Sequence, residues 1–257
     1  MKRLAACILL LGSSALGDLT NDVQSWTNGP YVAFVGDSIT AGYPSYHPAS
    51  DGGPSGNTNA NVAAQLLTLT GGLVTGTNFG VQGKRWVPSG SYGLAYNVTN
   101  AVRTRPKYVF ARCGVNDITA GNSWADVLVQ MNLVRSICVS SNALLVIQDI
   151  LPRTSGDDVF ALTIRTWNSN FTAWASTSGV RRIADHDLFG TNRASTGLRD
   201  DLDDSFDYDG LHLTTNAYPF WSRVVLTNLI DFLSGSALRY GSATGRTAVV
   251  TTLSVQY

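Results

Sequence analysis

The sequence predicts a single α/β domain, a three-layer α/β/α sandwich around a central parallel sheet of five strands, with one extra strand at the C-terminus. Short apolar and β-branched segments alternate along the chain with longer segments whose apolar residues recur at helical spacing. Strands that alternate with helices form parallel sheets, and the helices cover both faces. A chain of 257 residues also suits one hydrophobic core.

Each strand is expected to lead into a helix. The predicted strands are residues 31–35, 73–78, 108–113, 143–150 and 180–184. The predicted helices, several of which end near Gly or Pro, are residues 61–68, 94–103, 124–138, 160–175 and 216–233. Trp124, Trp167 and Trp174 fall among apolar residues at helical spacing, so we expect them in the core.

The two ends of the chain lie outside the predicted domain, which spans residues 18–234. Residues 1–17 are typical of a signal peptide, with a basic start, a short apolar run and small residues before a cut. We expect a secreted or periplasmic protein without a stable membrane anchor, because the apolar run is too short to span a bilayer. Residues 235–257 read as a Gly/Ser linker and a strand with one apolar face, which we expect to pack on its own domain in a monomer.

Composition narrows the possible partners. The chain is 44% hydrophobic and 14% charged, as in folded globular proteins, and its formal net charge is zero. Without a net positive charge there is no electrostatic reason to expect nucleic acid, so a small polar or neutral molecule is the better candidate. Cys113 and Cys138 are expected to remain unpaired, because the predicted strand and helix separate them by about a strand length, roughly 15 Å.

Polar, glycine-marked segments follow the first three predicted strands. They are residues 36–40 (GDSIT), 78–83 (NFGVQG) and 114–117 (GVND). In a parallel α/β sheet ligands bind outside the carboxyl ends of the strands, so these segments are candidates for chemistry.

A serine in one of these segments could be a nucleophile if a histidine and an acid activate it. Ser38 is the candidate serine. Of the three histidines only His212 has an aspartate, Asp209, three residues before it, so one short segment could supply both base and acid. The backbone N–H groups of Ser38 and Gly83 and the side-chain amide of Asn116 could stabilise the oxyanion of an ester intermediate.

Together, the GDSIT, NFGVQG, GVND and DGLH segments, in this order, resemble the SGNH, or GDSL-type, hydrolase superfamily, over roughly residues 31–233. The resemblance implies a flavodoxin-like sheet and a cofactor-independent serine esterase that works through an acyl-enzyme. It also implies that Ser38, Asp209 and His212 are catalytic and that Ser38, Gly83 and Asn116 form the oxyanion hole. Gly83 is preferred to Gly80 because the family places this glycine five residues after an asparagine, here Asn78.

Other interpretations compete with these. An α/β-hydrolase would carry Gly-x-Ser-x-Gly, which does not occur, and no His-Glu-x-x-His or Cys-x-x-Cys predicts a metal. Asp37 could simply cap the turn after the first strand, and His47 and His186 are expected in exposed loops. The acidic residues Asp201, Asp203, Asp207 and Asp209 weakly suggest a calcium loop, although their spacing departs from an EF-hand.

The substrate is the least determined part of the prediction. Tyr43, Arg85 and Trp86 are expected to form the rim of the site. No long apolar lid is apparent that would shelter a fatty chain, so we expect short acyl groups, chiefly acetyl, on a small-molecule or glycan ester. The alternatives are a lysophospholipase or thioesterase-like lipid hydrolase, or a sugar O-acyltransferase that uses the same residues.

Overall fold

A computed structural model describes residues 30–43, 61–88, 93–195 and 197–233 of the chain. The predicted signal peptide, the C-terminal linker and strand, and His47 lie outside the described residues. None of the described helices is long and apolar enough to cross a membrane.

A five-stranded parallel sheet forms the centre of the molecule, with strand order β2-β1-β3-β4-β5. The strands are β1 (Tyr31–Gly36), β2 (Thr75–Gly80), β3 (Tyr108–Arg112), β4 (Leu144–Gln148) and β5 (Arg181–Ile183). All five lie where the sequence predicts a strand, which confirms the fold class. Gly36 at the end of β1 aligns with Gly80 of β2 and Arg112 of β3, so three strands end at one level and their following loops lie side by side.

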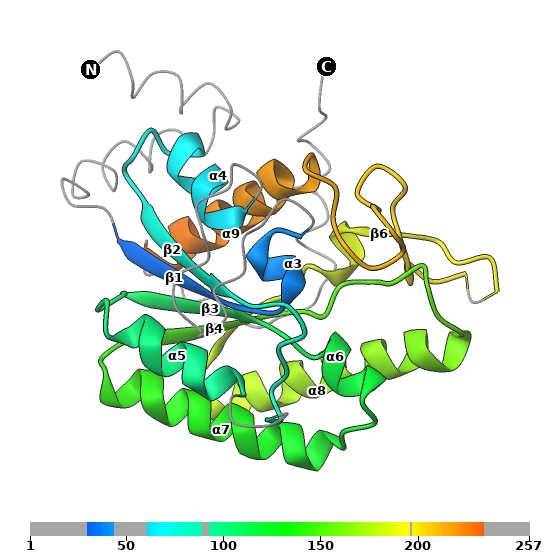
Figure 1. Cartoon of the computed structure of the whole chain (residues 1–257), viewed down its shortest axis with the longest axis horizontal. Helices are drawn as coiled ribbons and strands as arrows, with labels where there is room; N and C mark the ends of the chain where they lie inside the picture. Colours follow the sequence, from blue (N-terminus) through cyan, green and yellow to red (C-terminus); the bar gives the residue numbers. More distant parts are fainter. Residues whose placement is uncertain (1–29, 44–60, 89–92, 196, 234–257) are drawn as a thin grey trace.

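Helices cover both faces of this sheet (Figure 1). On one face lie α4 (Val62–Leu69) and α9 (Ala217–Leu233). The other face is covered by α5 (Leu94–Val102), α7 (Trp124–Ser140) and α8 (Asp158–Ser178). Each helix overlaps its predicted range closely. Because the sheet separates two apolar layers, its central strands β1 and β3 are buried almost throughout.

Several short elements were not predicted from the sequence. They are α3 (Ser38–Ala41), α6 (Val115–Thr119), the 3-10 helix η1 (His186–Leu188) and the antiparallel pair β6 (Gly190–Thr191) and β7 (Asp201–Leu202). Hydrophobic periodicity cannot identify segments this short, because they complete no more than about one helical turn or one strand pair. Two of them, α3 and α6, directly follow β1 and β3.

The core agrees with the sequence in two further respects. Trp167 and Trp174 are buried, and Trp124 packs partly buried against the same apolar cluster. Cys113 and Cys138 are both free and buried, as expected.

Candidate active site

Ser38 is the first residue of α3, immediately after β1. Asp37 caps this short helix, since its Oδ1 accepts a hydrogen bond of 3.0 Å from the backbone N–H of Ile39. The cap was one of the roles considered for Asp37. Its carboxyl is only 1% exposed, and burial raises its pKa to about 6, an effect that the Ile39 N–H and the positive charges of Arg112 and His212 offset only in part.

His212 and Asp209 lie in the loop that precedes α9, and His212 faces Ser38. Nε2 of His212 lies 2.9 Å from Oγ of Ser38, and its Nδ1 lies 2.8 Å from Oδ2 of Asp209. The other Asp209 oxygen accepts hydrogen bonds from the backbone N–H groups of Leu211 and His212, at 3.1 and 2.8 Å. Partial burial acts to raise the pKa of Asp209, but the hydrogen bonds from His212 outweigh it and the pKa is lowered. The fold thus brings together three residues that the sequence analysis singled out.

The Asp209–His212 loop is held to its surroundings by further hydrogen bonds. The backbone N–H and the hydroxyl of Ser155 both donate to the carbonyl of Gly210, at 3.0 and 2.9 Å. The hydroxyl of Tyr218 in α9 donates to the carbonyl of Ile39 in α3, at 3.0 Å. The histidine-bearing and serine-bearing segments are therefore fixed relative to each other.

Two of the acidic residues before His212 accept hydrogen bonds from nearby side chains and backbone. Asp203 accepts hydrogen bonds from the backbone and hydroxyl of Ser205, and Asp207 accepts one from the hydroxyl of Thr154. Within the described part of the chain, no three His, Cys, Asp or Glu side chains are arranged to hold a metal ion.

The loop after β2 and the helix α6 lie against each other. Asn116 in α6 donates from Nδ2 to the carbonyl of Lys84, at 3.1 Å. The carboxylate of Asp117 accepts hydrogen bonds from the backbone N–H groups of Trp86 and Val87, at 2.9 and 3.0 Å. Asp117 was not singled out from the sequence, although it adjoins Asn116, and it joins the segments that carry Gly83 and Asn116.

Gly80 and Gly83 have different structural roles. Gly80 ends β2, where a Cβ atom would lie 2.3 Å from the backbone nitrogen of Ala41 in α3, so its packing tolerates only glycine. Gly83 has φ of +69°, which favours glycine, and a Cβ there would meet nothing within 4 Å. Gly83 thus lies in an open turn, whereas Gly80 lies between β2 and α3.

The three predicted rim residues are placed differently. Tyr43 lies beside His212, with ring centroids 4.2 Å apart. Arg85 is half-buried in the loop after β2. Trp86 is only 1% exposed, and its Nε1 donates to the carbonyl of Cys113 at 3.0 Å, so its ring packs in the core and not at an exposed rim. Its large apolar ring is more stable in the core than at a solvated rim.

His186 is buried, contrary to the expectation of an exposed loop residue. Its Nδ1 lies 2.8 Å from the carbonyl oxygen of Ile150 and 3.2 Å from Nδ2 of Asn168. Asn168 also bonds both the N–H and the carbonyl of Ile150, at 2.9 Å each. Burial lowers the pKa of His186. Asn168 and His186 hold the segment after β4, and neither role was predictable from the residue type alone.

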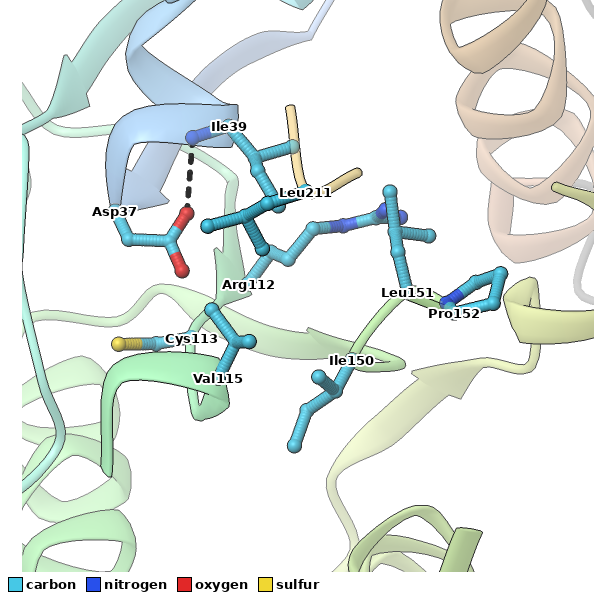
Figure 2. A pocket seen from close by; sticks show the side chains of 9 residues that line it. All are labelled: Asp37, Ile39, Arg112, Cys113, Val115, Ile150, Leu151, Pro152 and Leu211. Carbon is cyan, nitrogen blue, oxygen red and sulfur yellow. Dashed lines mark hydrogen bonds between the residues drawn. The ribbon is translucent and has the colours of Figure 1, made fainter. Parts of the chain in front are cut away.

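A small cavity opens between these segments, beside the turn that carries Ser38 (Figure 2). The residues on both sides of Ser38 line it, as does Leu211, the residue before His212. Figure 2 shows Val115 and Ile150 closing the cavity from the opposite side. It has room for about one water molecule, which is also about the size of a methyl group.

The model of the GDSL-like lipase/acylhydrolase family matches residues 34–219. Similar solved structures include a GDSL-like lipase from Bacteroides thetaiotaomicron (13% identity, 83% of this chain, 96% of that chain, TM-score 0.59). The carbohydrate acetylesterase Est24 from Sinorhizobium meliloti (13%, 79%, 99%, TM-score 0.58) and the aryl esterase of M. smegmatis (16%, 80%, 100%, TM-score 0.57) are also similar. None of the curated proteins matches the chain significantly. At these identities the likeness to solved structures shows a shared fold.

Proposed function

Because the chain belongs to the GDSL-like lipase/acylhydrolase family and is thus a carboxylic ester hydrolase, we propose that Ser38 is its nucleophile, His212 its general base and Asp209 the acid that orients the base. One observation carries the proposal, the continuous hydrogen-bonded series of Ser38 Oγ, His212 Nε2 and Nδ1, and Asp209 Oδ2, with steps of 2.9 and 2.8 Å. A serine within reach of a base that a third group orients is the arrangement that activates a hydroxyl.

In the first half of the reaction, Oγ of Ser38 attacks the ester carbonyl carbon while Nε2 of His212 takes the hydroxyl proton. Asp209 accepts the hydrogen bond from Nδ1 and stabilises the imidazolium that forms. The tetrahedral intermediate collapses as the bond to the alcohol oxygen breaks. Nε2 returns its proton to that oxygen, the alcohol leaves, and the acyl group remains on Ser38.

In the second half, water replaces the alcohol. Nε2 of His212 takes a proton from the water as its oxygen attacks the acyl carbon, and then gives that proton to Oγ of Ser38 as the carboxylic acid leaves. In both halves negative charge develops on the carbonyl oxygen. We assign its stabilisation to the N–H groups of Ser38 and Gly83 and the amide of Asn116, each such donor contributing on the order of 3 kcal/mol. The hydrogen bond from Asn116 to Lys84 supports this assignment because it ties α6 to the Gly83 turn.

For the substrate we propose short acyl groups, chiefly acetyl, on a carbohydrate alcohol. The cavity next to the Ser38 turn supports a small acyl group, because it has room for about one methyl group. Apolar side chains such as Ile39, Val115 and Leu211 line it, together with the buried charged groups of Asp37 and Arg112. The shared fold with Est24, described as a carbohydrate acetylesterase, is compatible with a sugar as the alcohol.

A serine-directed phosphonate tests the nucleophile directly. The wild-type protein should be labelled on the peptide that contains Ser38, and Ser38→Ala should lose both the label and esterase activity. Ser136→Ala is the matched control, because this exposed serine on α7 donates only to the backbone of its own helix. Labelling or full turnover in Ser38→Ala would refute the assignment.

The substrate class is tested by p-nitrophenyl esters of increasing chain length and by an acetylated oligosaccharide. We expect kcat/KM to be highest for acetyl and to fall as the acyl chain grows, since the cavity cannot hold a longer chain without moving Ile150 or Leu211. A maximum at long acyl chains would instead indicate a lipid hydrolase. Transfer of the acyl group to an added sugar would identify an acyltransferase.

A further inference from the structure

Tyr43 is tied to the turn that carries Ser38. It follows Gly42, which ends α3 in the left-handed conformation with φ of 96°. The backbone N–H of Tyr43 donates to the carbonyl of Ser38 at 3.1 Å, and the N–H of Gly42 donates to the carbonyl of Ile39 at 3.3 Å. This is the pattern of a Schellman cap, which fixes the chain direction beyond the helix end. One helical turn therefore positions both Ser38 and Tyr43.

The ring of Tyr43 lies on the imidazole of His212. The ring centroids are 4.2 Å apart and the planes are inclined by 38°. The ring of Tyr208 meets Tyr43 edge-on at 6.2 Å and has no such contact with His212 among the described ring pairs. His212 thus meets Oγ of Ser38 at Nε2, Asp209 at Nδ1 and an aromatic ring across one face.

Asp209 supports the imidazole from a partly exposed position. Its side chain is 38% exposed, whereas that of His212 is 13% exposed. Water competes for a hydrogen bond to a carboxylate that is this accessible, and it screens the attraction between the carboxylate and an imidazolium. A second group that restrains the ring and favours its charged form would therefore matter more here than beside a buried acid.

We propose that Tyr43 is a positioning residue of the triad, which holds the imidazole of His212 toward Ser38 and stabilises its imidazolium form through the face of the ring. This inference rests on the proposed function. The electron-rich face of an aromatic ring attracts a cation within about 6 Å of its centroid, and this attraction strengthens only when the imidazole takes the proton of Ser38. An interaction that is stronger in the transition state than in the ground state raises kcat.

The test compares two substitutions at one position. Tyr43→Phe keeps the ring and should retain kcat close to that of the wild type. Tyr43→Leu removes the ring at a broadly similar size and should lower kcat roughly 5- to 30-fold, the range expected for loss of one cation–π contact. KM for p-nitrophenyl acetate should change little in both. Tyr208→Leu is the control, because it removes a neighbouring exposed ring that lies edge-on to Tyr43 and forms no ring pair with His212 among the described residues. The backbone N–H of Tyr208, which donates to the carbonyl of His212, is retained in this variant.

A readout that does not depend on turnover accompanies the kinetics. The proton between Nδ1 of His212 and Asp209 should give a downfield proton resonance in Ser38→Ala. In the Ser38→Ala/Tyr43→Leu variant this resonance should broaden as the imidazole gains freedom, while Ser38→Ala/Tyr43→Phe should keep it sharp. Thermal unfolding of every variant identifies any that fails to fold.

Three results would overturn the inference. They are wild-type kcat in Tyr43→Leu, equal losses in Tyr43→Phe and Tyr43→Leu, or a change confined to KM, which would make Tyr43 a substrate contact only. These results differ from failure of the proposed function, which would appear as turnover that persists in Ser38→Ala.

Discussion

Asp37 should lower the stability of the folded protein at neutral pH, and replacing it by asparagine should remove that cost. The carboxyl is 1% exposed, and burial raises its pKa from 3.8 to about 6. Each pKa unit corresponds to about 1.4 kcal/mol. Ionising Asp37 in the folded chain therefore costs about 3 kcal/mol more than ionising it in the unfolded chain. Asparagine has nearly the same shape and can accept the same cap hydrogen bond from Ile39.

The raised pKa of Asp37 determines whether stability rises or falls with pH. A carboxyl whose pKa is raised on folding contributes its full stability below about pH 4 and loses it as the pH rises through about 6. The Asp37→Asn variant carries no such titration. Its free energy of unfolding should match that of the wild type near pH 4 and exceed it by up to about 3 kcal/mol near pH 8.

Urea unfolding at a series of pH values between about 4 and 8 measures this difference. Asp204→Asn is the control, because it removes an exposed carboxylate in a surface turn. A stability difference that does not vary with pH, or an Asp37→Asn variant that is less stable at pH 8, would refute the reasoning. In that case Arg112 and His212 would compensate the buried charge more completely than its burial indicates.

Two further predictions concern residues around the site. Asp209→Asn should lower kcat by on the order of 10³- to 10⁴-fold while leaving the fold intact, because the amide cannot stabilise the imidazolium; steady-state kinetics would contradict the role of Asp209 if kcat remained at the wild-type value. Asn168→Ala should cost about 2–4 kcal/mol of unfolding free energy, because it leaves the buried N–H of Ile150 without its partner. Thermal unfolding measures that loss, and a variant as stable as the wild type would contradict it.

The layers of the fold were predictable because the spacing of apolar residues identifies long strands and helices. Strand β1 and the first four residues of β3 are apolar or aromatic, and α8 carries buried Ile164 and Phe171 at helical spacing. The family, too, could be identified from four short segments, and the family comparison confirms it. Ser38 was a candidate because parallel strands present their loops at one edge of the sheet. Asp209 and His212 were candidates because of their three-residue spacing and the resemblance to the family.

The environment of single side chains was less predictable. His186 stands between two aspartates in the sequence, which favours an exposed loop, yet the fold turns it inward onto the carbonyl of Ile150. Trp86 follows Lys84 and Arg85, but its ring packs into the core below them. In both cases the neighbouring residues in the sequence are polar, but the side chain contacts a residue that is far away along the chain. Only the tertiary structure therefore determines whether it is buried. The short helices α3 and α6 were missed because they offer too few residues for a periodic pattern.

The separation of Ser38 from His212 along the chain has a consequence for protein synthesis. Ser38 leaves the ribosome early, whereas His212 and the helix that follows it come near the end of the chain. The hydroxyl of Tyr218 in α9 bonds the Ser38 turn, and Ser222 in the same helix donates to the carbonyl of Val62 in α4. On the proposed mechanism, a nascent chain carries an unactivated Ser38 until helix α9 docks. Esterase activity thus reports that the C-terminal part of the domain has closed over the N-terminal part, and incomplete chains cannot hydrolyse esters through this site.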